Sequence, residues 1–284
     1  MIRRRIVEEP TSQLAIWARR FAMFSLPVAM LAIIIGRTGL LEFGPVLVTF
    51  GAALVLALIG IVLAFGAFVV IWKDGLDGLG YALFAMLVGV LLLGYPTYLG
   101  IKGYNLPPIS DITTDPIDPP RFEAIARVRN RDANPVTYAG LYSAELQHAA
   151  YPDVEPLFTD ANAQAAYDAT MTVLTKRRKW RVIDQRPPLA GRREGHIEAV
   201  ARTAIMGFPD DVVVRIRADG DGARVDARSA SRYGKYDFGT NAARIKSLLD
   251  EIDDVANLDK EKSERPTRPA QKPSGTKNNQ AGKR

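Results

Sequence analysis

Apolar residues form three long stretches within the first hundred positions, over residues 21–36, 43–72 and 79–101. A helix needs about 20 mainly apolar residues to cross the ~30 Å hydrocarbon core of a bilayer. The second and third stretches reach this length. The first reaches it if it extends to Leu41, with the long side chain of Arg37 directed toward the far interface. The pattern therefore predicts three transmembrane helices.

Beyond residue 120 the pattern is that of a folded α+β domain, in which helical and strand periodicities alternate. The predicted elements are a helix over 161–179, strands over 180–185, 196–205, 211–218 and 223–232, and a final helix over 240–255. The sequence Asp219-Gly220-Asp221-Gly222 predicts a tight hairpin turn between the last two strands. Strands joined by short turns and flanked by helices indicate an antiparallel sheet with helices packed on one face.

Two segments lack a periodic apolar pattern. Residues 105–120 contain five prolines and predict an extended tether between the membrane part and the domain. From residue 260 onward the chain has eight Lys or Arg and three Pro without a large apolar residue, which predicts a disordered basic tail. The predicted regions are a basic cytoplasmic N-terminus (1–20), a three-helix membrane region (21–104), the tether (105–120), an α+β domain (121–258) and the tail (259–284).

Composition narrows the classes of protein. Charged residues make up 24% of the chain, yet residues 21–101 contain only five of them, which excludes a purely soluble protein. The net charge of +6 comes from the two ends, so a nucleic-acid-binding domain is not expected. No ionisable residue lies deep in a predicted span, which disfavours a transporter or channel. The lack of cysteine excludes disulfides and cysteine-ligated metals.

Basic residues before the first span predict the orientation. Cytoplasmic segments carry an excess of Lys and Arg, so this end should stay in the cytoplasm. The residues concerned are Arg3, Arg4, Arg5, Arg19 and Arg20. Three crossings then place the domain on the opposite side, which is the periplasm in a Gram-negative cell. If the first stretch did not span, the domain would face the cytoplasm instead.

Several segments of the polar part resemble one protein family. They are TDP at 114–116, PPRF at 119–122, YPDV at 151–154, GFPDDVVVR at 207–215 and VDARSASRYGKYDFGTNAARI at 225–245. Over about residues 112–255 the chain is similar to the bacterial domain-of-unknown-function family numbered 1499, in a membrane-anchored version. That family has no established activity, so the resemblance implies domain limits and no reaction.

The loop over residues 232–239 is the first choice for a ligand or partner site. Its three aromatic residues, two glycines and two cations exceed what a strand-to-helix connection needs. The loop leads into a helix N-terminus, whose free N–H groups favour an anion. The predicted ligand-binding residues are Arg228, Arg232, Lys235, Thr240 and Asn241. The expected partners are the lipid bilayer and an anionic ligand or a membrane protein, and no cofactor is expected.

The charged residues of the hairpin allow other readings. Asp226, Arg228 and Arg232 lie near Asp210, Asp211, Arg215 and Arg217 in the predicted sheet. Cross-strand Asp–Arg pairs on a solvated sheet face are the favoured interpretation. A metal held by His196 and Glu198 is disfavoured because the two histidines are far apart, and a surface histidine is expected.

Two functional hypotheses follow. The first is a non-enzymatic inner-membrane protein whose periplasmic domain binds an anionic ligand or a protein partner. The alternative is a periplasmic hydrolase, in which Asp210 and Asp211 divide acid and base roles beside His196. Convergence of these three side chains in one pocket would favour the hydrolase.

Overall fold

The three predicted apolar helices are present in the computed structural model, which describes residues 10–189 and 194–264. They are α1 (Gln13–Thr38), α2 (Phe43–Asp74) and α3 (Leu79–Asn105), and each is long and apolar enough to cross a membrane. Helix α1 begins before the apolar stretch and includes Arg19 and Arg20. Its 26 residues rise about 39 Å, so the first span is not short. The predicted basic residues Arg3, Arg4 and Arg5 lie outside the described residues.

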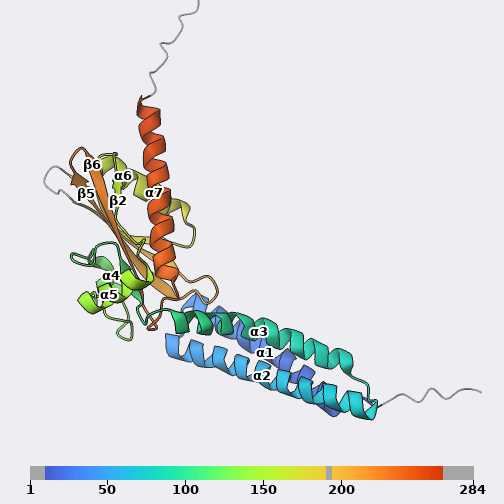
Figure 1. The fold of residues 1–284 in the computed structure, drawn as a ribbon. Coiled ribbons are helices and arrows are strands. Elements are labelled where there is room, and N and C mark those ends of the chain that lie inside the picture. Colours follow the sequence, from blue (N-terminus) through green and yellow to red (C-terminus); the bar gives the residue numbers. More distant parts are fainter. Residues whose placement is uncertain (1–9, 190–193, 265–284) are drawn as a thin grey trace, which may run out of the picture.

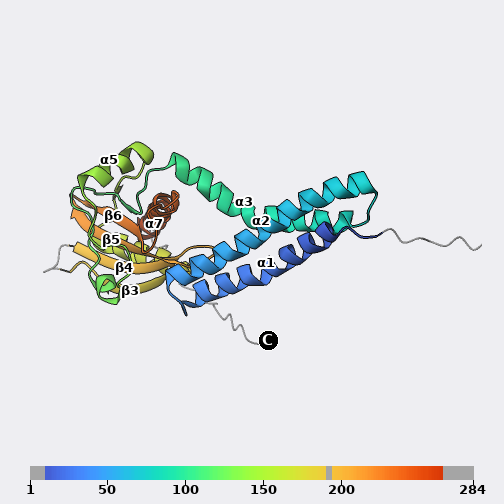
Figure 2. The same ribbon diagram turned by 90° about the horizontal axis from the view of Figure 1, so that it is seen from below.

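Small side chains bring the three helices together at the end remote from the domain. The buried cluster there consists of Ala15, Ala18, Ala22, Ala64, Ala67, Ala82, Ala85 and Val88. Alanine at these positions lets the helix backbones approach closely, which is how helices associate in lipid. Figure 2 shows α1 and α2 continuing together toward the domain, while α3 diverges from them. The domain therefore contacts the α1–α2 hairpin at one place and the end of α3 at another.

The domain is built on a six-stranded antiparallel sheet with strand order β1-β6-β5-β4-β3, and β2 also pairs with β6. Its strands are β1 (Asp111–Thr113), β2 (Leu157–Thr159), β3 (Arg181–Arg186), β4 (Glu194–Arg202), β5 (Pro209–Asp219) and β6 (Gly222–Ser231). Asp219 pairs with Gly222 across the predicted hairpin turn, where Gly220 has a φ of 56°. This left-handed conformation is one that glycine adopts readily.

Two helices cover one face of the sheet, as the sequence predicts (Figure 1). They are α6 (Ala163–Lys176) and α7 (Thr240–Glu264), and the shorter α4 (Ala124–Val128) and α5 (Leu141–Ala150) lie elsewhere. The core under α6 and α7 includes Leu174, Ile197, Val212, Val214, Ile216, Val225, Ile245, Leu248 and Ile252. Alternate residues of the strands and one stripe of each helix supply this core, in agreement with the strand and helix periodicities of the sequence.

The opposite face of the sheet is also covered, which the sequence analysis did not expect. Phe122 and Ile125 pack there against Val200, Val213 and Ala230. The charged face is therefore buried and not solvated. The segment predicted as a tether contributes as well, because its residues 111–113 form β1 beside β6. The apolar side chain of Ile112, fully buried in the core, anchors this strand.

Helix α7 is longer than predicted. It continues from the expected end at Val255 to Glu264, so the predicted tail begins as helix. Leu, Lys and Glu in this stretch are good helix formers, which favours continuation of the helix. The remainder of the predicted tail, residues 265–284, lies outside the described residues.

Candidate functional site at the membrane junction

The tip of the α1–α2 hairpin meets the loop between β4 and β5. The Arg37 Nη1 donates to the carbonyl oxygens of Ala204 (2.9 Å) and Ile205 (3.1 Å). A Cβ at Gly36 would lie 2.9 Å from the Met206 carbonyl oxygen, which is too close for any other residue without a shift. Gly36 thus permits this part of the domain to lie directly on α1.

Loop 232–239 contacts two further helices. The Tyr233 ring stacks on Phe43 at the start of α2, with centroids 4.8 Å apart and planes 7° apart. At the other end of the loop, Phe238 packs over Gly103 of α3, where a Cβ would lie 2.9 Å from the ring. Phe238 has a φ of 51°, a conformation uncommon outside glycine, which points to a strained backbone held by its surroundings. The aromatic content of the loop is therefore explained by docking on α2 and α3.

A cavity of about 220 Å³ lies where the hairpin tip meets the domain. The residues that line it are Gly36, Gly39, Leu40, Leu41, Glu42, Phe43, Val46, Asn130, Arg202, Phe208, Pro209, Arg232 and Tyr233. One wall thus comes from the membrane helices and the other from the domain. Of the predicted ligand-binding residues, only Arg232 lines this cavity.

The two predicted arginines have carboxylate partners of their own. Arg228 is buried and donates to both carboxylate oxygens of Asp111, at 2.9 and 2.6 Å. Arg232 donates from Nε and Nη2 to Asp211, which is fully buried. The guanidinium of Arg228 also bonds to the Pro120 carbonyl oxygen. The two guanidinium groups therefore bind separate aspartates and do not form one anion site.

The start of α7 already holds a carboxylate. Asp237 accepts hydrogen bonds from the backbone N–H groups of Gly239 (2.9 Å) and Asn241 (3.1 Å). These are the free N–H groups that the sequence analysis assigned to an anion. The Asn241 side chain is buried, where its Nδ2 donates to Ser110 and Ser231, and Lys235 is exposed. The anionic partner of this helix start is thus supplied by the chain.

The three residues of the hydrolase hypothesis have different partners. Adjacent strand residues point to opposite faces of a sheet. Asp210 accordingly faces α7 and pairs with Arg244, while Asp211 faces the other side and pairs with Arg232. Burial raises the pKa of both aspartates, and the arginines oppose that shift. His196 bonds to Glu198, so the three side chains are not brought to one pocket.

Glu198, considered from the sequence only as a disfavoured metal ligand beside His196, is a structural anchor. Its carboxylate accepts hydrogen bonds from the backbone N–H groups of Glu123, Ala124 and Ile125, at 2.7 to 2.9 Å, and contacts His196 Nε2 at 2.9 Å. Burial favours the neutral form, but the hydrogen bonds outweigh it and lower the pKa of Glu198 from 4.5 to about 2. The side chain thereby holds the start of α4 on the sheet.

A metal reading of this cluster is not supported. Asp184, His196 and Glu198 place their ligand atoms within 4.8 Å of one another. The oxygens of Glu198 are committed to α4, and Asp184 accepts a hydrogen bond from Arg186 at 2.9 Å. The prediction of a surface histidine was wrong for His196. This residue is buried, because the segment around α4 covers this part of the sheet. We assign no metal here.

The comparison with protein families covers half of the chain. Residues 111–252 match the family described as protein of unknown function (DUF1499). The chain belongs to the DUF1499 family. The matched residues begin at β1 and include loop 232–239, so the docking loop is part of the DUF1499 domain. A comparison with curated proteins found no match to this chain.

The interior of the DUF1499 domain contains a network of paired charges. Asp226 is fully buried and bonds to Arg215 (3.2 Å), Arg217 (3.0 Å) and Arg224 (2.8 Å). The same arginines reach Asp115 or Asp118 on the segment after β1. Three arginines thus face three aspartates, and the network is neutral. We call this set of six residues the interior network.

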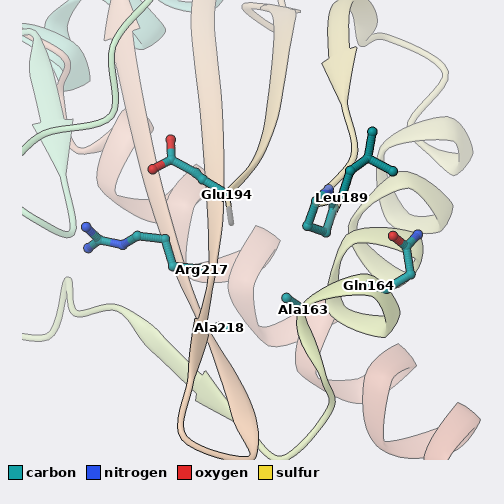
Figure 3. Close-up of a pocket in the computed structure, with 7 residues that line it drawn as sticks. Ala163, Gln164, Leu189, Glu194, Arg217 and Ala218 are labelled. Carbon is teal, nitrogen blue, oxygen red and sulfur yellow. The ribbon is translucent and has the colours of Figure 1, made fainter. Parts of the chain in front are cut away.

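A second, larger hollow of about 670 Å³ lies on the far side of the DUF1499 domain. Figure 3 shows Glu194 and Arg217 projecting to one side of the sheet, away from Gln164 and Leu189. Its polar side chains therefore do not converge on a common point. Two of its lining residues, Leu189 and Glu194, are the last and first described residues on either side of the gap at 190–193, and we base no site on it.

Proposed function

We propose that this protein is a non-enzymatic binding or scaffold protein of the bacterial inner membrane, with its DUF1499 domain in the periplasm. The observation that carries the proposal is the contact of loop 232–239 with two membrane helices, through Tyr233 and Phe238. A domain held in this way keeps a fixed place at the membrane surface. There it presents the junction to an anionic ligand or to a membrane protein.

The positions of the basic residues support the proposed orientation. Arg19 and Arg20 lie in the first turns of α1, at the end of the bundle remote from the domain. The connection between α2 and α3 lies at that same end, since Ser12 N donates to the Asp77 carbonyl oxygen at 2.8 Å. An arginine-rich end is typical of the cytoplasmic side, which leaves the domain outside.

The pairing of charges supports a non-enzymatic role. General acid and base groups act within hydrogen-bond reach of one substrate position. In the part of the chain that the structure describes, Asp210 and Asp211 point to opposite faces and each is paired with an arginine. His196 is committed to Glu198 beneath α4. These side chains stabilise the domain rather than meet a substrate.

The docked arrangement is tested by cross-linking, for which a chain without cysteine is well suited. Leu41 and Asn130 both line the junction cavity, one from each part. The double variant Leu41→Cys, Asn130→Cys should be joined by a short bifunctional thiol reagent in native membranes. The control pair Leu41→Cys, Asp221→Cys, with Asp221 at the far hairpin, should not be joined. Equal yields from both pairs would show that the domain is not held at the helices.

The orientation is tested with reporters fused to the C-terminus. An alkaline phosphatase should be active there, because it folds only outside the cytoplasm. A fluorescent protein that requires cytoplasmic folding should be dark. The reverse result would place the domain in the cytoplasm and reject the periplasmic assignment, while leaving the cross-linking result untouched.

A further inference from the structure

At the junction, two arginines donate only to backbone carbonyls in the described part of the chain, and one of them, Arg202, lines the cavity. The Arg202 Nη1 donates to the carbonyl oxygens of Gly207 (3.0 Å) and Arg37 (3.4 Å). Arg37 in turn donates to the carbonyl oxygens of Ala204 and Ile205. Among the described residues, neither guanidinium forms an ion pair. Backbone carbonyls satisfy N–H groups but leave the positive charges uncompensated, so an anion is favoured beside them.

A further arginine behind the cavity adds to this excess. Arg129 and Arg232 share the single carboxylate of Asp211, and the Arg129 side chain is only 4% exposed. Its Nη1 and Nη2 are buried and have no hydrogen-bond partner in the described part of the chain. Buried donors without partners are costly. Asn130, the next residue, lines the cavity, so this unsatisfied cation lies beside the cavity wall.

The charges around the cavity therefore do not cancel. Two arginines line the cavity, Arg202 and Arg232, and two more lie next to them: Arg37, whose carbonyl oxygen binds Arg202, and Arg129, which shares Asp211 with Arg232. The carboxylates are Asp211, beneath the wall, and Glu42, which lines the cavity itself. The local excess is two positive charges. This differs from the interior network, in which the chain provides a carboxylate for each arginine.

The apolar part of α1 ends beside the cavity, which is where the lipid headgroups begin if α1 spans the bilayer. Arg20 and Arg37 mark the two ends of the apolar part of α1, and the residues between them rise about 26 Å, close to the thickness of the hydrocarbon core. Leu40 and Leu41 at the hairpin tip are 76% and 50% exposed, as expected for apolar residues in contact with lipid. On α3, the exposed Tyr98 is typical of the membrane–water interface.

We propose that the junction cavity binds the phosphate of an anionic phospholipid headgroup, with the acyl chains outside it along the membrane helices. Arginine is the side chain best suited to a phosphate, because its planar fork donates two parallel hydrogen bonds. The volume of about 220 Å³ suits a headgroup phosphate rather than a whole ligand, for which pockets of ~300 Å³ or more are usual. This inference rests on the proposed binding function and specifies its ligand. It also requires the domain to be docked on the helices, because the cavity lies between them.

The test uses the full chain purified in a nonionic detergent. Its thermal unfolding midpoint is measured with phosphatidylglycerol, with phosphatidylcholine, or with inorganic phosphate at the same phosphate concentration. Phosphatidylglycerol should raise the midpoint clearly more than phosphatidylcholine does, because only its headgroup carries a net negative charge. Inorganic phosphate should give a small shift. An equal shift with both lipids would overturn the proposal, and so would a full shift with inorganic phosphate, which would assign the cavity to a free anion.

Variants of opposite sign separate binding from a general loss of stability. Arg202→Gln should remove at least half of the extra shift produced by phosphatidylglycerol, and Arg202→Lys should restore most of it. Glu42→Gln removes the carboxylate that lines the cavity and should enlarge the shift. Arg178→Gln makes the same charge change at an exposed arginine outside the cavity and should behave as wild type. If Arg202→Gln and Arg178→Gln act alike, the site is wrong even where the cross-link between Leu41 and Asn130 forms.

Discussion

The interior network and the membrane junction both contain arginines. In the interior network these arginines are paired with aspartates, whereas two arginines at the junction have no carboxylate partner among the described residues. In the interior network, Asp226 bonds to three arginines and is fully buried. At the junction, Arg37 and Arg202 donate only to backbone carbonyls among the described residues. In the first set the chain thus supplies a carboxylate for each arginine, whereas the described residues supply none for Arg37 or Arg202. A run of Asp and Arg in a sequence therefore indicates a site only where the chain does not supply the counter-charge.

The largest effect should come from the interior network. Asp226→Asn removes the fully buried carboxylate at the centre of the network and leaves three arginines, of which Arg215 is buried, with two carboxylates. Removing one partner of a buried ion pair costs about 3–5 kcal/mol, so most of the stability of the domain should be lost. Unfolding of the full chain in detergent, followed by circular dichroism, measures this loss. A change below ~0.5 kcal/mol would mean that water reaches the network.

Arg232 belongs to both regions, because it lines the cavity and pairs with Asp211. Arg232→Glu places a second carboxylate beside the buried Asp211, with Arg129 as the remaining cation. The free energy of unfolding should fall by about 3 kcal/mol. Arg202→Gln, at an arginine without a carboxylate partner, should change it by less than ~1 kcal/mol. Similar losses in the two variants would remove the distinction between paired and unpaired arginines.

Glu198, which lies outside both regions, adds a pH-dependent part to the stability of the domain. Its pKa falls from 4.5 in the unfolded chain to about 2 in the fold, so the native state favours the ionised form. The resulting stability is fully present above pH 4.5 and is lost as the pH falls through about 2. The loss amounts to roughly 3 kcal/mol. Glu198→Gln should be less stable at pH 7 and should lack this part of the acid dependence, which unfolding curves between pH 7 and pH 2 will detect.

The docking contact itself should have a smaller effect. Gly103→Val places a side chain against Phe238 and should displace loop 232–239 from α3 without unfolding the domain. Trypsin should then cut after Lys235 roughly fivefold faster, which corresponds to ~1 kcal/mol of docking. Gly94→Val is the control, since a Cβ at Gly94 meets nothing within 4 Å. Equal cutting rates in the two variants would show that α3 does not hold the loop.

The smallest effect is expected at an exposed ion pair. Lys246 lies 2.6 Å from Asp153, as short as the buried pairs, but the two side chains are 40% and 75% exposed. Water already solvates both charges, so Lys246→Ala should change the free energy of unfolding by less than ~0.5 kcal/mol. A loss comparable to that of Asp226→Asn would show that distance, and not burial, sets the value of these pairs.

Local patterns predicted most of the fold, because helices and hairpins have their own periodicity. The three membrane helices, the β5–β6 hairpin and the apolar stripe of α7 all follow from residues close in sequence. The segment that covers the second face of the sheet could not be predicted in this way. Arg228 bonds to Asp111, which is 117 residues away, and no local pattern links the two. Such pairings decide whether a charged face is solvated or buried.

The candidate site was only partly predictable for the same reason. The excess of aromatic residues in loop 232–239 was visible, but its partners Phe43 and Gly103 lie in a different part of the chain. One error came from a strand boundary. The predicted strand began at Asp211, whereas β5 begins at Pro209 and includes Asp210, so the two neighbouring aspartates point to opposite faces and cannot share an acid–base role. The sequence could not reveal that Arg202 has no carboxylate partner among the described residues, because this depends on every residue that surrounds it in the fold.

Helix α7 determines how far the described chain extends perpendicular to the three-helix bundle. It begins beside α3 and runs across the direction of the membrane helices (Figure 1). Its 25 residues rise about 37 Å, more than the width of a three-helix bundle. A protein fused beyond its end is therefore carried outside the footprint of the bundle and away from the Leu41 end of α1. Large fusions can be attached at the end of α7 with the junction cavity left free.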